Sequence, residues 1–495
     1  MQAKYDELLT ILGKVDDIGR AAGLLGWDQQ TYMPPGGVAS RASQMATLES
    51  MAHELFTADR VGELLDEVAP WAEAQGYDSL PVSAIRVTRR EYERYRKLPN
   101  KLVAAKAEAV GLAFDAWQKA KHASDFSIFQ PRLERLVELS VEEAEALGYQ
   151  EERYDALVDR FEPGMRTKRL VEIFDRLEKE LVPLVRAAGR LAGDDALQGR
   201  SFPAQAQQDF ARELLTAMGF SFERGRMDVA EHPFTSGFSP SDVRITNHPY
   251  EHAMLSNVFS TIHEGGHALY EQGVPTAFDR MPVSGSASLG MHESQSRLWE
   301  NIIGRSLPFW RHFYPKLQAH FPVQLGTVLL EAFYKTVNRV KPSLIRVEAD
   351  ELTYNLHIIL RFNLERELLN GTVRVADLPA IWNERMRAGL GVTPAHDAEG
   401  VLQDVHWSHG IFGYFPTYSL GNIYSGQIYN RMREDLPDLE GAVGRGELLG
   451  VKAWLNEHVH VHGGKYEPED LIKKITGEGL TVEPYLEYLK GKYGK

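Results

Sequence analysis

The chain has 495 residues, of which 43% are hydrophobic and 25% charged, as in an ordinary globular protein with a sizeable core. Its 55 basic and 69 acidic side chains give a formal charge of −14, which argues against nucleic acid and anionic membranes as partners, since both require clustered Lys and Arg. It contains no cysteine, so disulfides, thiolate zinc sites and a cysteine nucleophile are excluded.

The first residues, MQAKYDELLTILGK, are amphipathic and carry acids, so they do not resemble a signal peptide. No run of about 18 apolar residues predicts a membrane span. We therefore expect a cytoplasmic protein without membrane association.

Helical periodicity dominates the chain. Apolar residues recur at intervals of three and four in Leu133–Leu147, and the same pattern follows from Leu170 to Leu181. Each stretch predicts an amphipathic helix that faces a core. We find no internal repeat and no obvious linker.

One region breaks the helical pattern. In His232–Thr246, HPFTSGFSPSDVRIT combines turn residues with an alternation of Val243 and Ile245 with polar neighbours, which predicts a short β-hairpin. The hairpin is either a connector or an edge strand onto which an extended peptide pairs through its backbone.

The segment TIHEGGHALYEQG (Thr261–Gly273) contains the pattern HExxH. His263 and His267 lie four residues apart, so on a helix both imidazoles reach one metal ion. Glu264 then sits beside the open coordination position, where it takes a proton from water. This arrangement is typical of zinc-dependent peptidases.

Two adjacent glycines, Gly265 and Gly266, interrupt the same predicted helix. Each costs a helix about 1 kcal/mol relative to alanine. We expect them to let the substrate or another backbone come close to the metal helix. The alternative is that they serve only the packing of one helix against another.

The third metal ligand must come from another segment. Glu271 is eight residues from His263, about 12 Å along a helix, and is too far away to share its metal ion. Residues Gly290–Gly304 predict a second helix that carries His292 and Glu293. Two histidines plus a carboxylate is the commoner peptidase set, so we favour Glu293, and His292 stays an alternative.

Blocks spread along the chain resemble the carboxypeptidase Taq family of metallocarboxypeptidases. They are LGWDQQTYMPPGG (Leu25–Gly37), HPF (His232–Phe234), DVRIT (Asp242–Thr246), HEGGH (His263–His267), HESQ (His292–Gln295), IRVEAD (Ile345–Asp350) and GVLQDVHW (Gly400–Trp407). The resemblance runs nearly end to end, and no motif position departs from the family pattern. It implies a mainly α fold related to neurolysin and angiotensin-converting enzyme, with two lobes, a deep central groove and a small β-hairpin or sheet near the active site.

We accordingly expect a single metallocarboxypeptidase domain over residues 1–495. Within it we place an N-terminal helical part at 1–230, a catalytic part at 231–430 and C-terminal helices at 431–495. The resemblance implies removal of single residues from peptide C-termini with broad side-chain tolerance. It also implies a homodimer, and one zinc ion per chain that cobalt replaces in some members.

The resemblance also assigns roles in catalysis. It makes Glu264 the general base and acid, and it assigns the metal to His263, His267 and Glu293. His406, Tyr414 and Tyr418 are candidate donors to the oxyanion, because related helical peptidases use a histidine and a tyrosine from the corresponding late segment. We favour Tyr418 over Tyr414, and the alternative is that these aromatic residues belong to the core.

A carboxypeptidase must bind a free α-carboxylate, which requires a cation. Arg244 and Arg346 lie in family-like blocks, and their alternative role is a structural ion pair with a neighbour such as Asp242 or Asp350. The family suggests that the loop around Arg346 limits substrate length by closing one end of the groove. The remaining candidate substrate-binding residues are His232, Gln403 and Tyr414.

Two other functions fit parts of this pattern. An endo-acting oligopeptidase on the same fold is the alternative enzyme, because HExxH does not distinguish exo from endo cleavage. A helical peptide-binding protein without activity belongs to a different class, and intact Glu264 with a complete ligand set argues against it.

Overall fold

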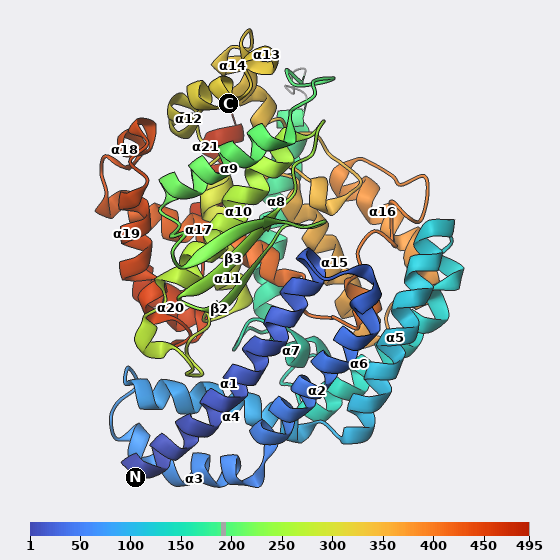
Figure 1. Cartoon of the computed structure of the whole chain (residues 1–495). Coiled ribbons are helices and arrows are strands. Elements are labelled where there is room, and N and C mark those ends of the chain that lie inside the picture. The colour runs from blue at the N-terminus through green and yellow to red at the C-terminus, as the bar shows by residue number, and fades with distance from the viewer. Residues whose placement is uncertain (190–194, 495) are drawn as a thin grey trace.

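Helices make up most of the chain in the computed structural model, which describes residues 1–189 and 195–494 (Figure 1). The mainly α fold class predicted from the sequence is confirmed. The α-helices are α1 (Gln2–Thr31), α2 (Val38–Thr57), α3 (Asp59–Glu73), α4 (Leu80–Lys97), α5 (Asn100–Ala123), α6 (Gln130–Leu147), α7 (Arg153–Val158), α8 (Thr167–Gly189), α9 (Ala204–Met218), α10 (Met254–Gly273), α11 (Leu289–Arg297), α12 (Leu307–His320), α13 (Pro322–Leu325), α14 (Leu330–Val337), α15 (Tyr354–Asn370), α16 (Leu378–Leu390), α17 (Pro416–Asp435), α18 (Leu439–Arg445), α19 (Leu449–His458), α20 (Pro468–Thr476) and α21 (Glu483–Tyr493).

The two helices predicted from apolar periodicity are present as α6 and α8. Leu133 and Leu136 of α6 and Leu170 and Leu177 of α8 are fully buried, as the three–four spacing requires. Helix α6 ends before Gly148, which has a φ of 79°. Glycine adopts this backbone angle without steric strain. Among the described residues, no helix is long and apolar enough to cross a membrane.

The predicted hairpin is also present. Strand β2 (Phe234–Ser239) runs antiparallel to β3 (Asp242–Asn247), and β1 (Gly225–Val229), which we did not predict, adds a parallel strand on the other side of β3. Strand β2 is therefore an edge strand. Val243 and Ile245 are fully buried on the sheet face that packs on α10, where Figure 1 shows the sheet in front of that helix.

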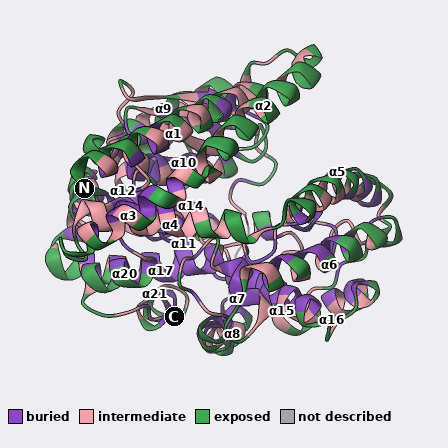
Figure 2. Ribbon diagram, turned by 90° about the horizontal axis from the view of Figure 1, so that it is seen from below, coloured by how far each residue is buried: buried purple, intermediate pink, exposed green. Residues whose placement is uncertain are grey.

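The buried residues form two hydrophobic clusters. The larger draws on helices from α5 to α21, and Figure 2 shows its buried ribbon concentrated around α7, α11 and α17. The smaller belongs to α1, α3 and α4. Every residue of α2 is exposed or half-buried (Figure 2). The expected part boundaries near residues 230 and 430 stay a prediction.

The paired glycines of α10 face two neighbouring helices. A Cβ atom on Gly266 would lie 2.6 Å from the carbonyl oxygen of Gln295 and 2.7 Å from Cα of Ser296, both in α11. A Cβ atom on Gly265 would meet side-chain ends of α9, at 2.8 Å from Leu215 Cδ2 and 2.9 Å from Met218 Cε. These contacts show the close approach of another backbone at Gly266 and ordinary packing against helix side chains at Gly265.

Gly266→Ala should destabilise the protein more than Gly265→Ala. The methyl group at position 266 meets backbone, so α11 must move, which costs about 1–3 kcal/mol of the free energy of unfolding. The methyl group at position 265 meets flexible side chains, and the gain in helix propensity, about 1 kcal/mol, offsets much of its cost. Thermal unfolding of both variants measures the difference. Equal losses, or a larger loss for Gly265→Ala, would contradict this account of the α10–α11 contact.

Candidate metal centre and active site

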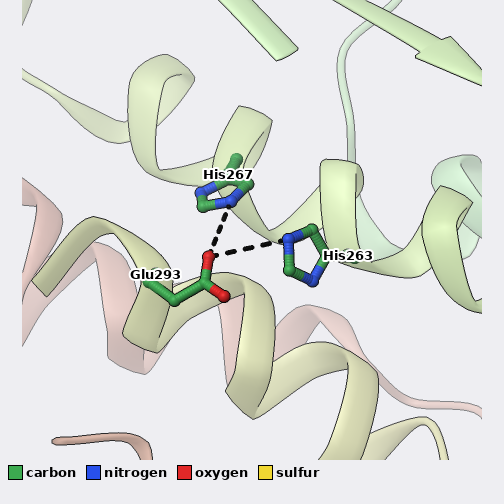
Figure 3. A group of neighbouring side chains, drawn as sticks. All are labelled: His263, His267 and Glu293. Carbon is green, nitrogen blue, oxygen red and sulfur yellow. Dashed lines mark ion pairs between the residues drawn. The ribbon is translucent and has the colours of Figure 1, made fainter. Parts of the chain in front are cut away.

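Helices α10 and α11 bring the three predicted metal ligands together (Figure 3). Oε2 of Glu293 lies 3.6 Å from Nε2 of His263 and 3.2 Å from Nε2 of His267. Ligands about 2.0–2.1 Å from a tetrahedral ion lie about 3.3 Å from one another. Two imidazoles and one carboxylate at these separations therefore fit a zinc-sized divalent cation.

Arg297, one helical turn after Glu293, fixes the orientation of that carboxylate. Its Nε donates to Glu293 Oε1 at 2.7 Å, so the other oxygen, Oε2, is directed toward the histidines. Burial alone would raise the pKa of Glu293, but the charges of Arg297 and His263 lower it well below its ordinary value. The ligand is therefore ionised, as metal binding requires.

Glu300 orients the first histidine. Its Oε2 accepts a hydrogen bond from Nδ1 of His263 at 2.9 Å, which leaves Nε2 free to bind the metal. Glu300 lies in the π-helix η4 (Leu298–Ile303), which continues α11, so the helix predicted over residues 290–304 changes type in its second half. This role was not predicted from the sequence, although Glu300 follows Glu293 by seven residues and so faces the same side of an α-helix.

His292, the alternative third ligand, has other partners. Its Nε2 lies 2.8 Å from Oε1 of Glu271, and its ring stacks on His267 with centroids 4.4 Å apart. The structure thus directs Glu293, and not His292, toward the pair of nitrogen ligands.

Glu264 projects from the same helix as the two histidines and is 8% exposed. Its Oε2 accepts a hydrogen bond from the hydroxyl group of Thr235 at 2.8 Å. Burial raises the pKa of Glu264 above its ordinary value. A buried carboxylate with a raised pKa beside a metal site is suited to proton transfer.

The late segment brings His406, Tyr414 and Tyr418 together. His406 lies in the 3₁₀ turn η7 (His406–His409), and its Nε2 is 3.4 Å from the hydroxyl oxygen of Tyr418 in α17. Burial lowers the pKa of His406 to about 4, so this imidazole is neutral at pH 7. The ring of Tyr414 lies 5.3 Å from that of Tyr418.

Arg346 lies against this aromatic group. Its guanidinium carbon is 4.9 Å from the centre of the Tyr418 ring, and its Nε donates to Asp404 at 3.0 Å. Arg361 donates to the other oxygen of Asp404 at 2.6 Å. Two arginines share one carboxylate, so the cluster keeps one net positive charge. The alternative role considered for Arg346, a structural ion pair, is therefore present, but its partner is Asp404 and not the sequence neighbour Asp350.

Arg244 lies elsewhere. It makes a bidentate pair with Asp242, with both contacts at 2.9 Å, as its structural alternative predicted. Its guanidinium carbon is 4.5 Å from the ring of Trp27 and 5.1 Å from that of Phe238. Since Val243 and Ile245 face α10, the intervening Arg244 is on the opposite face of the sheet, toward α1.

The last two candidates are separate from the metal ligands. His232 is exposed, and its carbonyl oxygen lies 3.4 Å from the hydroxyl group of Thr246. Gln403 accepts from the backbone N–H of Arg346 at 2.9 Å and donates to the carbonyl oxygens of Leu344 and Glu399, both at 3.0 Å. Its amide therefore holds the loop that carries Arg346.

Comparisons with known proteins identify the family of the chain. Residues 7–493 match the carboxypeptidase Taq (M32) metallopeptidase family. The chain is 40% identical to carboxypeptidase 1 of Bacillus subtilis over 489 residues, which cover 98% of this chain and 97% of that protein. It is 41% identical to thermostable carboxypeptidase 1 of Thermus thermophilus over 504 residues, covering 99% and 98%. The crystal structure of the M32 carboxypeptidase from Deinococcus radiodurans R1 superposes with a TM-score of 0.95 at 38% identity and covers 99% of each chain.

The helical fold and its two-histidine, one-carboxylate site define a metallopeptidase. The chain belongs to the carboxypeptidase Taq family and is a metal-dependent carboxypeptidase. The family resemblance inferred from the sequence is thereby confirmed.

Glu293→Ala should weaken metal binding far more than His292→Ala. The first change removes an ionised ligand atom. Mutating a residue that only hydrogen-bonds to a ligand typically costs about 10–100-fold in metal affinity, so loss of the ligand itself should raise the Kd for zinc by more than that. The second removes a stacked neighbour, so the protein should still bind zinc stoichiometrically at micromolar concentrations. Equilibrium dialysis compares the variants, and the reverse ranking would show that His292 is the ligand.

Proposed function

We propose that this carboxypeptidase releases single C-terminal amino acids from peptides, with broad tolerance of the residue released, and that its native ion is zinc. The observation that carries the proposal is the convergence of two imidazoles and an ionised carboxylate on one point beside Glu264. Cobalt is the alternative ion, in keeping with the family. We further propose a cytoplasmic homodimer, for which the family resemblance is the support.

Each of the chain's own residues has a role in the proposed reaction. His263, His267 and Glu293 would hold the ion. When bound, the ion supplies a Lewis acid that polarises the scissile carbonyl group and acidifies the attacking water. Glu264 takes the proton of that water and then passes it to the leaving amine. The hydroxyl group of Tyr418, held beside neutral His406, donates to the developing oxyanion.

Arg346 is our candidate for the partner of the substrate carboxylate. Two observations support it over Arg244: the surplus positive charge that it shares with Arg361, and its position against the Tyr418 ring. Arg244 pairs one-to-one with Asp242, which leaves no surplus positive charge, and it lies on the sheet face away from α10. We propose that Gln403 acts on the substrate through the Arg346 loop, and that Tyr414 and the exposed His232 contact the peptide directly.

Glu264→Gln should retain the fold and the bound metal but lose nearly all turnover, because an amide cannot accept the proton. Metal analysis and the rate on one blocked dipeptide test this expectation. Substantial residual activity with full metal content would remove Glu264 from the proposed mechanism.

Amidating the C-terminus of a peptide should lower kcat/KM at least tenfold. Amidation removes a charge-assisted hydrogen bond worth about 1.5–3 kcal/mol and leaves the cation unpaired. Mass spectrometry should show peptides with free C-termini shortening one residue at a time, whatever blocks their N-termini. Equal rates on amidated and free peptides, or early internal fragments, would favour the endo-acting alternative.

Arg346→Ala and Arg244→Ala identify the cation. The variant that lacks the true carboxylate partner should cleave peptides with a free C-terminus more slowly. It should then discriminate little between free and amidated peptides. Replacing an arginine that is purely structural should slow the cleavage of free and amidated peptides alike. We expect Arg346 to show the first pattern, and loss of discrimination in Arg244→Ala alone would reverse the assignment.

A further inference from the structure

Thr235 connects the edge strand of the sheet to Glu264, the proposed base. It lies in β2, opposite the fully buried Ile245 of β3, so both side chains are on the sheet face that packs on α10. Its hydroxyl oxygen is 2.8 Å from Oε2 of Glu264 and 3.0 Å from the carbonyl oxygen of the same residue. The contact therefore joins two elements whose residues are 29 positions apart in sequence.

This hydroxyl group is the one hydrogen-bond donor to the Glu264 carboxylate in the part of the chain that the structure describes. Because Glu264 is 8% exposed, few water molecules are available to hold the carboxylate in its place. The bond occupies one oxygen, Oε2. The other oxygen, Oε1, has no protein donor among the described residues and is free to accept a proton.

We propose that Thr235 is a positioning residue for Glu264. Its hydroxyl group holds Oε2 so that Oε1 is presented to the attacking water, at the distance and angle that proton transfer requires. The proposal rests on the role of Glu264 as general base. It explains why a strand residue that binds no metal touches the base directly.

The replacements Thr235→Val and Thr235→Ser separate the hydroxyl group from the shape of the side chain. Valine keeps the volume and the branched Cβ atom that suits a strand, but it cannot donate a hydrogen bond. We expect Thr235→Val to lower kcat by about ten- to a hundredfold, since small misplacement of a catalytic group has effects of this size. KM and the Kd for zinc should stay near their original values. Thr235→Ser should restore most of kcat.

Ser236→Ala is the matched control. Ser236 follows Thr235 in β2 and pairs with Arg244, so its side chain lies on the opposite face of the sheet. Removing this hydroxyl group should leave kcat unchanged. An equal loss in Ser236→Ala would show that the strand, and not the Thr235 hydroxyl group, is responsible, and the proposal would fail.

A double-mutant cycle with Glu264→Gln tests whether Thr235 acts through the base. If it does, Thr235→Val should cause no further loss in the Glu264→Gln background, measured as slow product release by mass spectrometry. The same fractional loss in both backgrounds would overturn the proposal, as would a raised Kd for zinc that Thr235→Ser does not restore. Near-normal activity of Glu264→Gln itself would instead refute the proposed base, which is a distinguishable result.

Discussion

The metal site depends on how closely α11 packs between two other helices. On one side the missing side chain of Gly266 admits the α11 backbone to α10. On the other, a Cβ atom on Gly421 of α17 would lie only 2.5 Å from Cγ of Glu293. Both glycines forgo helix propensity at positions where any larger side chain would displace α11. The distance between Glu293 and the two histidines is thus set mainly by how closely the helix backbones pack.

Ion pairs around the metal site keep its carboxylates ionised. Buried Glu293 and half-buried Glu300 lie among Arg297 and Arg305, so the two carboxylates face two guanidinium groups. Although burial opposes ionisation, the charge of Arg297 holds the pKa of Glu300 at about 2. Removing either arginine would leave two carboxylates with one guanidinium group, and such an unbalanced charge is costly away from solvent. The network keeps the ligand and its outer partner ionised before any metal arrives, so binding need not displace protons from them.

Local features of the site were predictable from the sequence, and distant ones were not. The spacing of His263 and His267 is an intrahelical relation, and the turn residues Pro240 and Ser241 mark a hairpin, although Gly237 lies within β2. The parallel strand β1 was missed because its pairing with β3 skips over β2. The partner of Arg346 was missed for a similar reason: Asp404 lies 58 residues further along the chain, whereas Asp350, close in sequence, accepts hydrogen bonds from Lys341, Leu352 and Thr353.

The choice of Glu293 as the third ligand was likewise only partly predictable from the sequence. Residue type favoured it over His292, but the choice depends on which of the two side chains reaches the Nε2 atoms of His263 and His267, and that is a property of tertiary packing. The outer partners follow from the fold as well: Glu300 on its π-helical turn and Thr235 on its strand each touch a residue of α10 that was predicted from the motif.

The most direct test is an anomalous diffraction map from crystals of the wild-type protein grown with zinc, recorded at the zinc absorption edge. The account predicts one strong peak within about 2.0–2.2 Å of Nε2 of His263, Nε2 of His267 and a carboxylate oxygen of Glu293. A peak ligated by His292, or one that lacks Glu293, would contradict it.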